Sequence, residues 1–143
     1  MGLVQSIAAL FSRFARRNSG ADPRHALGRR GERLAEKYLR KHGHKILFRN
    51  FRAKGGGEVD LVCRDIAEKT LVFAEVKTRT SNRFGTGFEA VTAKKQQRLR
   101  RLAMAWIAAE KGQDPTRPAW RELRFDVAVV NAEGAVEVLQ AAF

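Results

Sequence analysis

The most distinctive pattern in the sequence is a pair of short apolar runs, residues 57–62 and 71–77, in which charged residues stand two positions apart. Side chains alternate between the two faces of a β-strand, so residues two positions apart share a face. The charged residues in these positions are Glu58 and Asp60 in the first run and Glu75 and Lys77 in the second. Each run is therefore predicted to be a strand with charge on one face. The other face is predicted to pack apolar residues, such as Val59 and Leu61, into a core.

The polar segment between the two runs is typical of a hairpin connection. In a hairpin centred between residues 67 and 68, Asp60 lies opposite Glu75. The same register places Glu58 opposite Lys77. Directly opposed residues are roughly 5 Å apart, so two opposed carboxylates repel each other unless a cation lies between them. Carboxylate oxygens with positions left for water suit Mg²⁺ or Mn²⁺, and we therefore predict a divalent metal site on this hairpin.

Apolar residues recur at helical spacing over residues 27–42 and again over 92–111, and each segment is predicted to be a helix with one buried face. Further strands are predicted over 45–52, 122–130 and 135–140. The order of the elements is helix, three strands, helix, two strands. This order predicts an α/β sandwich in which helices flank a central mixed β-sheet.

Three local expectations follow from the same pattern. Ile46, Phe48 and Asn50 are expected on one face of their strand. The glycine-rich segment 54–57 is expected to form a flexible turn that leads into the first charged strand. Asp126, inside an apolar strand, is interpreted as a structural residue paired with an arginine.

The chain of 143 residues has a formal net charge of +13. On one small domain, that charge is the electrostatic footprint of a nucleic acid or another anionic partner. Cys63 is the single cysteine, which favours a reducing, cytoplasmic compartment, and its apolar neighbours predict a buried, inert thiol. No run of about 18 apolar residues occurs, so no transmembrane segment is predicted.

Residues 1–22 are predicted to be a leader that precedes the folded domain at 23–143. Apolar residues recur at helical spacing in the leader and are followed by arginines. Two interpretations stay open for the leader. One is an amphipathic helix that touches a membrane or a partner, and the other is a poorly ordered segment.

Basic residues gather just beyond the charged strands. Lys94 and Lys95 fall in the first turn of the predicted helix 92–111, where cations oppose the helix dipole and backbone N–H groups attract anions. This placement favours contact with phosphate over local helix stability. The residues predicted to contact nucleic-acid phosphates are Arg79, Arg83, Lys94, Lys95, Gln96 and Arg98.

With these residues placed, the chain resembles the PD-(D/E)xK nuclease superfamily, in which a hairpin carries Asp and then Glu-x-Lys, and a preceding helix donates another Glu. The matching positions are Asp60, Glu75, Lys77 and Glu32. More narrowly, the chain is similar to the YraN family of small predicted bacterial endonucleases, which is related to archaeal Holliday junction resolvases. The matching stretches are 31–32, 49–52, 57–61, 73–79 and 124–126. Val59 stands where the superfamily name has proline, and the narrower family lacks that proline too.

The resemblance implies a restriction-endonuclease-like sandwich and a metal-dependent endonuclease that hydrolyses phosphodiester bonds in DNA, branched DNA included. It implies that Asp60, Glu75 and Glu32 hold Mg²⁺ or Mn²⁺. It implies that Lys77 orients or helps to deprotonate the attacking water, or neutralises the charge on the phosphate. Glu58, on the same strand face as Asp60, is expected to steer Lys77 or the outer shell of the metal.

Other functions remain open from the sequence. A non-catalytic, basic nucleic-acid-binding module would pair the same carboxylates with Lys77 and nearby arginines. A membrane-associated adaptor would use residues 1–17. The sequence also leaves open RNA as the nucleic acid, the form of a DNA substrate, and a homodimer.

Overall fold

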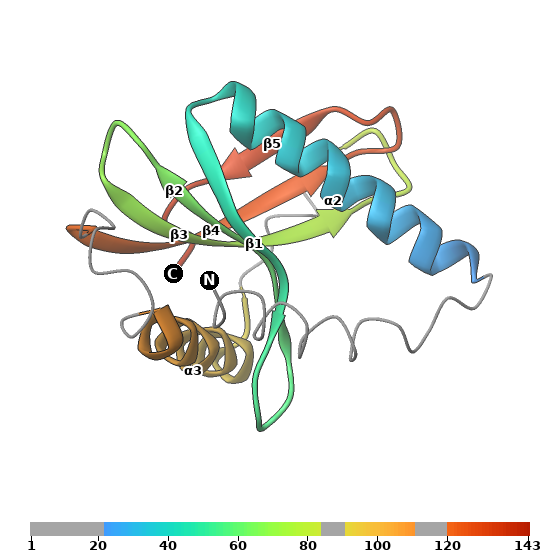
Figure 1. Ribbon diagram of the computed structural model, residues 1–143. Coiled ribbons are helices and arrows are strands. Elements are labelled where there is room, and N and C mark those ends of the chain that lie inside the picture. Colours follow the sequence, from blue (N-terminus) through green and yellow to red (C-terminus); the bar gives the residue numbers. More distant parts are fainter. Residues whose placement is uncertain (1–21, 84–90, 111–119) are drawn as a thin grey trace, which may run out of the picture.

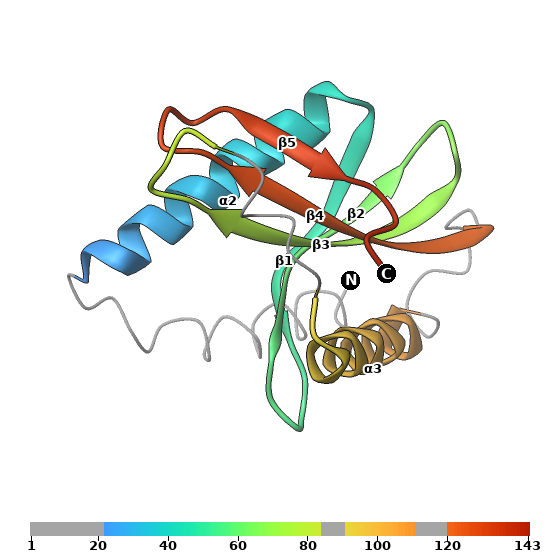
Figure 2. The same ribbon diagram turned by 180° about the vertical axis from the view of Figure 1, so that it is seen from behind.

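The computed structural model describes residues 22–83, 91–110 and 120–143, so the predicted leader lies outside the described residues except for Asp22. One β-sheet lies between two helices, with α2 (Pro23–Lys41) on one face and α3 (Ala93–Glu110) on the other (Figure 1). The view from behind shows the same three layers (Figure 2). Within these described ranges, neither helix combines the length and apolar character needed to cross a membrane.

The sheet has five strands, and their order across it follows the chain. The strands are β1 (His44–Arg52), β2 (Glu58–Asp65), β3 (Thr70–Thr78), β4 (Glu122–Val130) and β5 (Val136–Leu139). β3 and β4 are parallel, and the other neighbours are antiparallel. Parallel strands need a long crossover, and the connection through α3 supplies it. The predicted α/β sandwich with a central mixed sheet flanked by helices is confirmed.

The β2–β3 hairpin has the predicted register. Asp65 pairs with Thr70 at the turn, and the pairing continues to Leu61 and Ala74. Each pair is centred between residues 67 and 68, as the polar segment indicated. The hairpin therefore brings the charged ends of both strands to the same end of the sheet.

Each face of the sheet carries an apolar core. On the α3 side, Phe73 packs edge-to-face on Trp106, with ring centroids 6.1 Å apart. On the α2 side, Ala35 and Leu39 pack with Cys63, which is fully buried. Burial raises the pKa of the Cys63 thiol to about 12 and so disfavours the thiolate, which is the nucleophilic form. The prediction of a buried thiol is confirmed.

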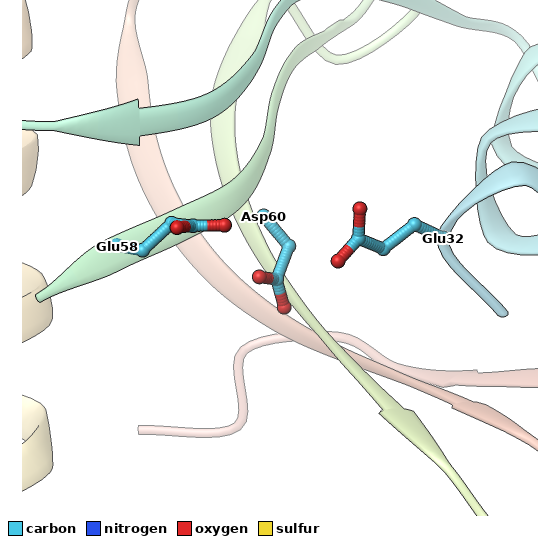
Figure 3. Close-up of side chains that lie close together, drawn as sticks. All are labelled: Glu32, Glu58 and Asp60. Atoms are coloured by element: carbon cyan, nitrogen blue, oxygen red, sulfur yellow. The ribbon is translucent and has the colours of Figure 1, made fainter. Parts of the chain in front are cut away.

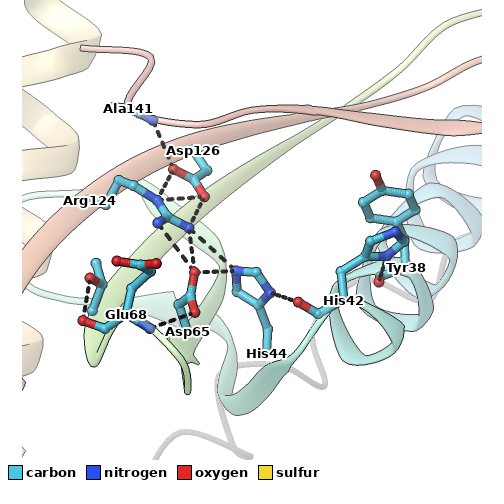
Figure 4. A network of polar contacts seen from close by, with 9 residues as sticks. Tyr38, His42, His44, Asp65, Glu68, Arg124, Asp126 and Ala141 are labelled. Carbon is cyan, nitrogen blue, oxygen red and sulfur yellow. Dashed lines mark hydrogen bonds and ion pairs between the residues drawn. The ribbon is translucent and has the colours of Figure 1, made fainter.

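A buried ion-pair network lies where the β2–β3 hairpin turns (Figure 4). Arg124 donates to Asp126 from Nε (2.9 Å) and from Nη2 (3.0 Å), and its Nη1 lies 3.4 Å from Asp65 Oδ2. Asp126 is 1% exposed and also accepts the backbone N–H of Ala141. A buried carboxylate needs such partners, because an unpaired buried charge is strongly destabilising. The interpretation of Asp126 as a structural residue paired with an arginine is confirmed.

Helix α2 begins earlier than the apolar spacing indicated, at Pro23 instead of residue 27. The side chain of Asp22 accepts the backbone N–H of Arg24 at 2.9 Å and caps the helix. Asp at the N-cap followed by Pro in the first turn is a strong start signal that apolar periodicity does not register. The helix ends at Lys41, and Gly43 follows with a left-handed φ of +83°.

The expected alternation along β1 is wrong. The register against β2 shifts between Ile46 and Phe48, so Ile46 packs on the α2 side and Phe48 on the α3 side. A β-bulge adds one residue to a strand and reverses the faces beyond it. Asn50 has a φ of +52°, which interrupts the alternation again. On β2, Val59 and Leu61 likewise reach different cores instead of sharing a face.

The α2 helix approaches β3 most closely at Gly31. A Cβ at this position would collide with Oγ1 of Thr78 and lie 3.2 Å from the Thr78 Cβ. The glycine therefore sets the distance between α2 and the end of β3. Glu32 is the next residue along the helix, so this contact also sets how far its carboxylate reaches over the sheet.

We predict that Gly31→Ala lowers the free energy of unfolding by about 1–3 kcal/mol, because the added methyl overpacks the helix–sheet contact. Gly28→Ala in the same helix is the matched control, since a Cβ there has no atom within 4 Å. That change is expected to stabilise the protein by up to about 1 kcal/mol through helix propensity. Urea denaturation measures both variants. Equal effects of the two substitutions would contradict the close contact.

Candidate functional site

Three carboxylates converge where the β2–β3 hairpin opens. Glu58 and Asp60 extend from β2, and Glu32 reaches toward them from α2 (Figure 3). One carboxylate oxygen from each residue lies within 4.8 Å of the other two, and all three side chains are half-buried. Glu32 therefore lies in one cluster with the two carboxylates of β2.

Asp60 occupies the point at which the two strands separate. The strand pairing runs as far as Leu61 and Ala74, and beyond it Asp60 Oδ2 accepts the backbone N–H of Val76 at 2.7 Å. Burial raises the pKa of Asp60 to about 7 despite this hydrogen bond. The charges of nearby glutamates, Glu32, Glu75 and Glu58, raise it further. Asp60 therefore sits in a site that disfavours its negative charge unless a cation is close.

Asn50 links the other two carboxylates of the cluster. Its Nδ2 donates to Glu32 Oε2 at 3.1 Å and to Glu58 Oε1 at 2.8 Å. Burial raises the pKa of Glu32, and the hydrogen bond from Asn50 partly opposes that shift. Asn50 has a left-handed φ of +52°, a conformation that asparagine tolerates better than most residues do. From the sequence, Asn50 was expected in a strand and in the matching stretch 49–52, and it was given no role in the site.

Glu75 points toward α3 and does not join the three-carboxylate cluster. Its Oε1 forms an ion pair with the Lys95 ammonium group. Its Oε2 is buried and has no hydrogen-bond partner in the described part of the chain. Glu75 is nonetheless near enough to Asp60 for its charge to raise the pKa of Asp60. The structure thus places Glu75 beside the cluster and not within it.

The predicted cross-strand partnership of Glu58 with Lys77 is replaced by contacts within the β1–β2 hairpin. Glu58 Oε2 accepts a hydrogen bond from Arg52 Nε at 2.5 Å, and Arg52 also forms an ion pair with it. Lys77 is half-buried at the end of β3, on the same strand as Glu75. In the described ranges, Lys77 has neither an ion pair nor a hydrogen bond from its side chain.

The residues predicted to contact phosphate are in varied surroundings. Lys95 is engaged by Glu75, and Gln96 donates from its side chain to the carbonyl of Val91 at 2.9 Å. Arg79 is half-buried and makes contacts within the protein. The remaining three, which are exposed, are Arg83, Lys94 and Arg98.

The glycine-rich segment that leads into β2 forms the predicted turn, and α3 anchors it. Arg101 donates from Nη1 to the carbonyl of Lys54 at 2.6 Å and from Nη2 to the carbonyl of Gly56 at 2.5 Å. Gly55, Gly56 and Gly57 all have left-handed φ angles, between +84° and +94°. Only glycine adopts three such conformations without strain. Arg101 could not be identified from the sequence, because its contacts span more than 40 residues of the chain.

The donor set fits a small divalent cation. All four acidic side chains offer carboxylate oxygens, the ligands preferred by Mg²⁺ and Mn²⁺. The buried, unpartnered Oε2 of Glu75 and the raised pKa of Asp60 are both unfavourable features that a bound cation would relieve. Glu32 and Asp60 are therefore the residues best placed to hold such an ion, with Glu58 in the same cluster. Glu75, which the resemblance implied as a ligand, lies beside the cluster and is paired with Lys95.

We predict that Asp60→Asn stabilises the metal-free protein at pH 8 by on the order of 2 kcal/mol and has little effect at pH 4. The pKa of Asp60 is about 7 in the folded protein, against an ordinary value of 3.8 for an aspartate in water. Well below pH 3.8 the group is neutral in both states, and near pH 4 the unfolded chain has only begun to lose the proton. As the pH rises toward 7, Asp60 loses its proton in the unfolded chain but keeps it in the folded protein. The free energy of unfolding of wild type therefore falls with pH, and that of the variant does not, because asparagine has no proton to lose.

Urea denaturation in EDTA at several pH values tests this prediction. Asparagine retains an oxygen that can accept the Val76 N–H, so the hydrogen bond survives the change. Glu122→Gln, at an exposed position of β4, is the control and should show no such pH trend. An Asp60→Asn variant that is less stable than wild type at pH 8 would refute the electrostatic description of the site.

The matching family model, described as "Uncharacterised protein family UPF0102", covers residues 31–130. A UPF0102 protein of Nocardia farcinica is 48% identical over 105 residues, which are 73% of this chain and 76% of that protein. One of Geobacter metallireducens is 43% identical over 115 residues, 80% of this chain and 87% of that protein. The matched region extends from the contact of α2 with β3 to the end of β4, and so contains every residue of the site described above. The chain belongs to the UPF0102 family.

Proposed function

We propose that this protein is a Mg²⁺- or Mn²⁺-dependent endonuclease that hydrolyses phosphodiester bonds in DNA. The observation that carries the proposal is the convergence of Glu32 and Asp60 where β2 and β3 separate, with Glu75 and Lys77 on the adjoining strand. These carboxylates repel one another and are partly desolvated, so the arrangement opposes folding. A metal-dependent activity gives that unfavourable arrangement a function.

Each side chain has a distinct part in the proposed reaction. Asp60, Glu75 and Glu32 would hold the cation, which supplies a water of lowered pKa and neutralises charge on the phosphate. Lys77 has no partner in the described ranges, so its ammonium group can orient the attacking water or bind a phosphate oxygen. Asn50 fixes Glu32 and Glu58 in place through its two hydrogen bonds.

The choice of DNA as substrate is supported by charge and by resemblance. The chain carries a net charge of +13, which suits a polyanion. The arrangement of Asp60, then Glu75-Val76-Lys77, with Glu32 on the preceding helix, resembles the PD-(D/E)xK nucleases. The narrower similarity to relatives of Holliday junction resolvases favours branched DNA over a smooth duplex.

A second candidate function is a non-catalytic nucleic-acid-binding module. The ion pairs of Glu75 with Lys95 and of Glu58 with Arg52 favour it, because they compensate two of the carboxylates without a metal. In that case the acidic residues would be structural. The two candidates differ in whether the protein responds to a divalent cation.

Cleavage of linear, nicked and four-way DNA in Mg²⁺ or Mn²⁺ tests the proposal. We predict that wild type cuts at least one of these substrates and that Lys77→Ala loses cleavage by on the order of 100-fold while binding DNA with nearly unchanged affinity. Lys45→Ala is the matched control, since Lys45 is exposed near the opposite end of β2. Binding without cleavage by wild type, under all these conditions, would favour the non-catalytic module.

We further predict that Lys95→Met increases the affinity for Mn²⁺ about tenfold, because Lys95 neutralises a carboxylate that the metal needs. Differential scanning fluorimetry with increasing Mn²⁺ measures this as a larger rise in Tm. Lys94→Met is the control, since Lys94 is exposed and carries the same charge as its neighbour Lys95. If Mn²⁺ leaves the Tm of wild type and both variants unchanged, the carboxylates do not form a metal site.

A further inference from the structure

A hollow at the junction of α2 and β1 is lined mainly by basic side chains. Its lining residues are Arg33, Glu36, Lys37, Arg40 and Arg49. Four of these five residues carry a positive charge, and a single carboxylate lies among them. We call this set the α2–β1 basic pocket. None of its residues was assigned a function from the sequence.

The carboxylate of Glu36 holds two of the guanidinium groups in place. Arg49 donates from Nε to Oε2 at 2.7 Å and from Nη2 to Oε1 at 2.5 Å. Arg40 donates from Nε to Oε1 at 3.0 Å. The hydrogen bonds from Arg49 lower the pKa of Glu36 and raise the pKa of Arg49, so both charges are maintained.

This arrangement prepares the pocket for an anion. A guanidinium has five N–H donors, and Glu36 engages only some of those on Arg40 and Arg49. The remaining donors have fixed directions, so little side-chain entropy is lost when an anion binds. Lys37 and Arg33 are exposed and add positive charge at the rim. One glutamate against four basic residues leaves the pocket strongly positive.

The pocket adjoins the acidic cluster along both of its elements. On α2, Glu36 follows Glu32 by four residues, about 6 Å along the helix axis. On β1, Arg49 precedes Asn50, which donates to Glu32 and Glu58. A chain of phosphates that passes over the carboxylates therefore meets the pocket next.

We propose that the α2–β1 basic pocket binds a backbone phosphate of the nucleic acid that flanks the phosphate undergoing hydrolysis. The inference rests on the proposed function and adds a direction to it, since the nucleic acid would run from the carboxylates along α2 and β1. Guanidinium groups bind phosphate oxygens through paired, charge-assisted hydrogen bonds, and the two arginines offer that geometry. The pocket would position the strand without reading its bases.

The test is the salt dependence of duplex DNA binding, measured by fluorescence anisotropy in EDTA so that cleavage does not interfere. The double variant Arg33→Gln, Lys37→Gln removes two exposed charges and leaves Glu36 with both of its arginine partners. We expect its affinity to fall about tenfold and the slope of log K against log salt to decrease by about 0.9 for each phosphate that is no longer neutralised. Lys45→Gln, Lys69→Gln is the matched control, with the same loss of charge at exposed positions away from the site.

A further variant separates geometry from charge. Arg49→Lys keeps the charge but cannot form the paired hydrogen bonds, so we expect it to bind about threefold more weakly than wild type. Thermal melting confirms that each variant is folded. Equal losses for the pocket variant and the control would overturn the inference. So would a pocket variant that loses binding to anionic phospholipid vesicles but keeps DNA affinity.

The outcomes distinguish the pocket from the catalytic proposal. If wild type cuts DNA in Mn²⁺ and the pocket variant binds and cuts as the control does, the pocket inference fails and the endonuclease stands. If DNA binding depends on the pocket but no metal-dependent cleavage occurs, the pocket contacts nucleic acid and the endonuclease fails. If wild type does not bind DNA at all, both are overturned.

Discussion

The repulsion among partly buried carboxylates at the open end of the β2–β3 hairpin is the constraint on which the rest of the structure depends. Asp60 loses much of its hydration there, and its pKa rises to about 7. Glu32, Glu58 and Glu75 add negative charge around it. A fold selected for stability alone would place apolar or paired residues at this point. The surrounding elements hold these groups in place against their repulsion.

Four contacts do most of that positioning. Gly31 lets α2 approach β3 closely, which brings Glu32 over the sheet. Asn50 bridges Glu32 to Glu58, and Arg101 anchors the glycine-rich segment that precedes Glu58. Lys95 neutralises Glu75 from α3. Both helix layers thus contribute to the site.

The β2–β3 hairpin could be predicted from the sequence because local chemistry determines it. A polar turn between two alternating runs admits one register that keeps both apolar faces buried, and the structure has that register. The bulge after Ile46 could not be predicted, since a single inserted residue leaves no mark on composition. The N-cap at Asp22 can be predicted from the Asp-Pro pair, which apolar spacing alone does not register.

Only part of the candidate site could be predicted from the sequence. Asp60 and Glu32 were expected together, and they are. Glu75 was expected opposite Asp60, but the strands separate at Asp60, and Glu75 turns to a lysine on α3. Asn50 and Arg101 went unrecognised because their partners lie on distant segments. The basic pocket was missed for the same reason, since Arg49 and Glu36 are 13 positions apart and meet only in the folded protein.

Direct titration of Mn²⁺ by electron paramagnetic resonance tests the central claim, that these carboxylates form a divalent cation site. Free Mn²⁺ gives a spectrum that bound Mn²⁺ loses, so the method counts bound ions without any assay of activity. We expect wild type to bind about one ion per chain at pH 8 and to bind more weakly below pH 7, as Asp60 takes up a proton. Asp60→Asn should lose this binding. Equal Mn²⁺ binding by wild type and Asp60→Asn, or none by wild type at pH 8, would contradict the account.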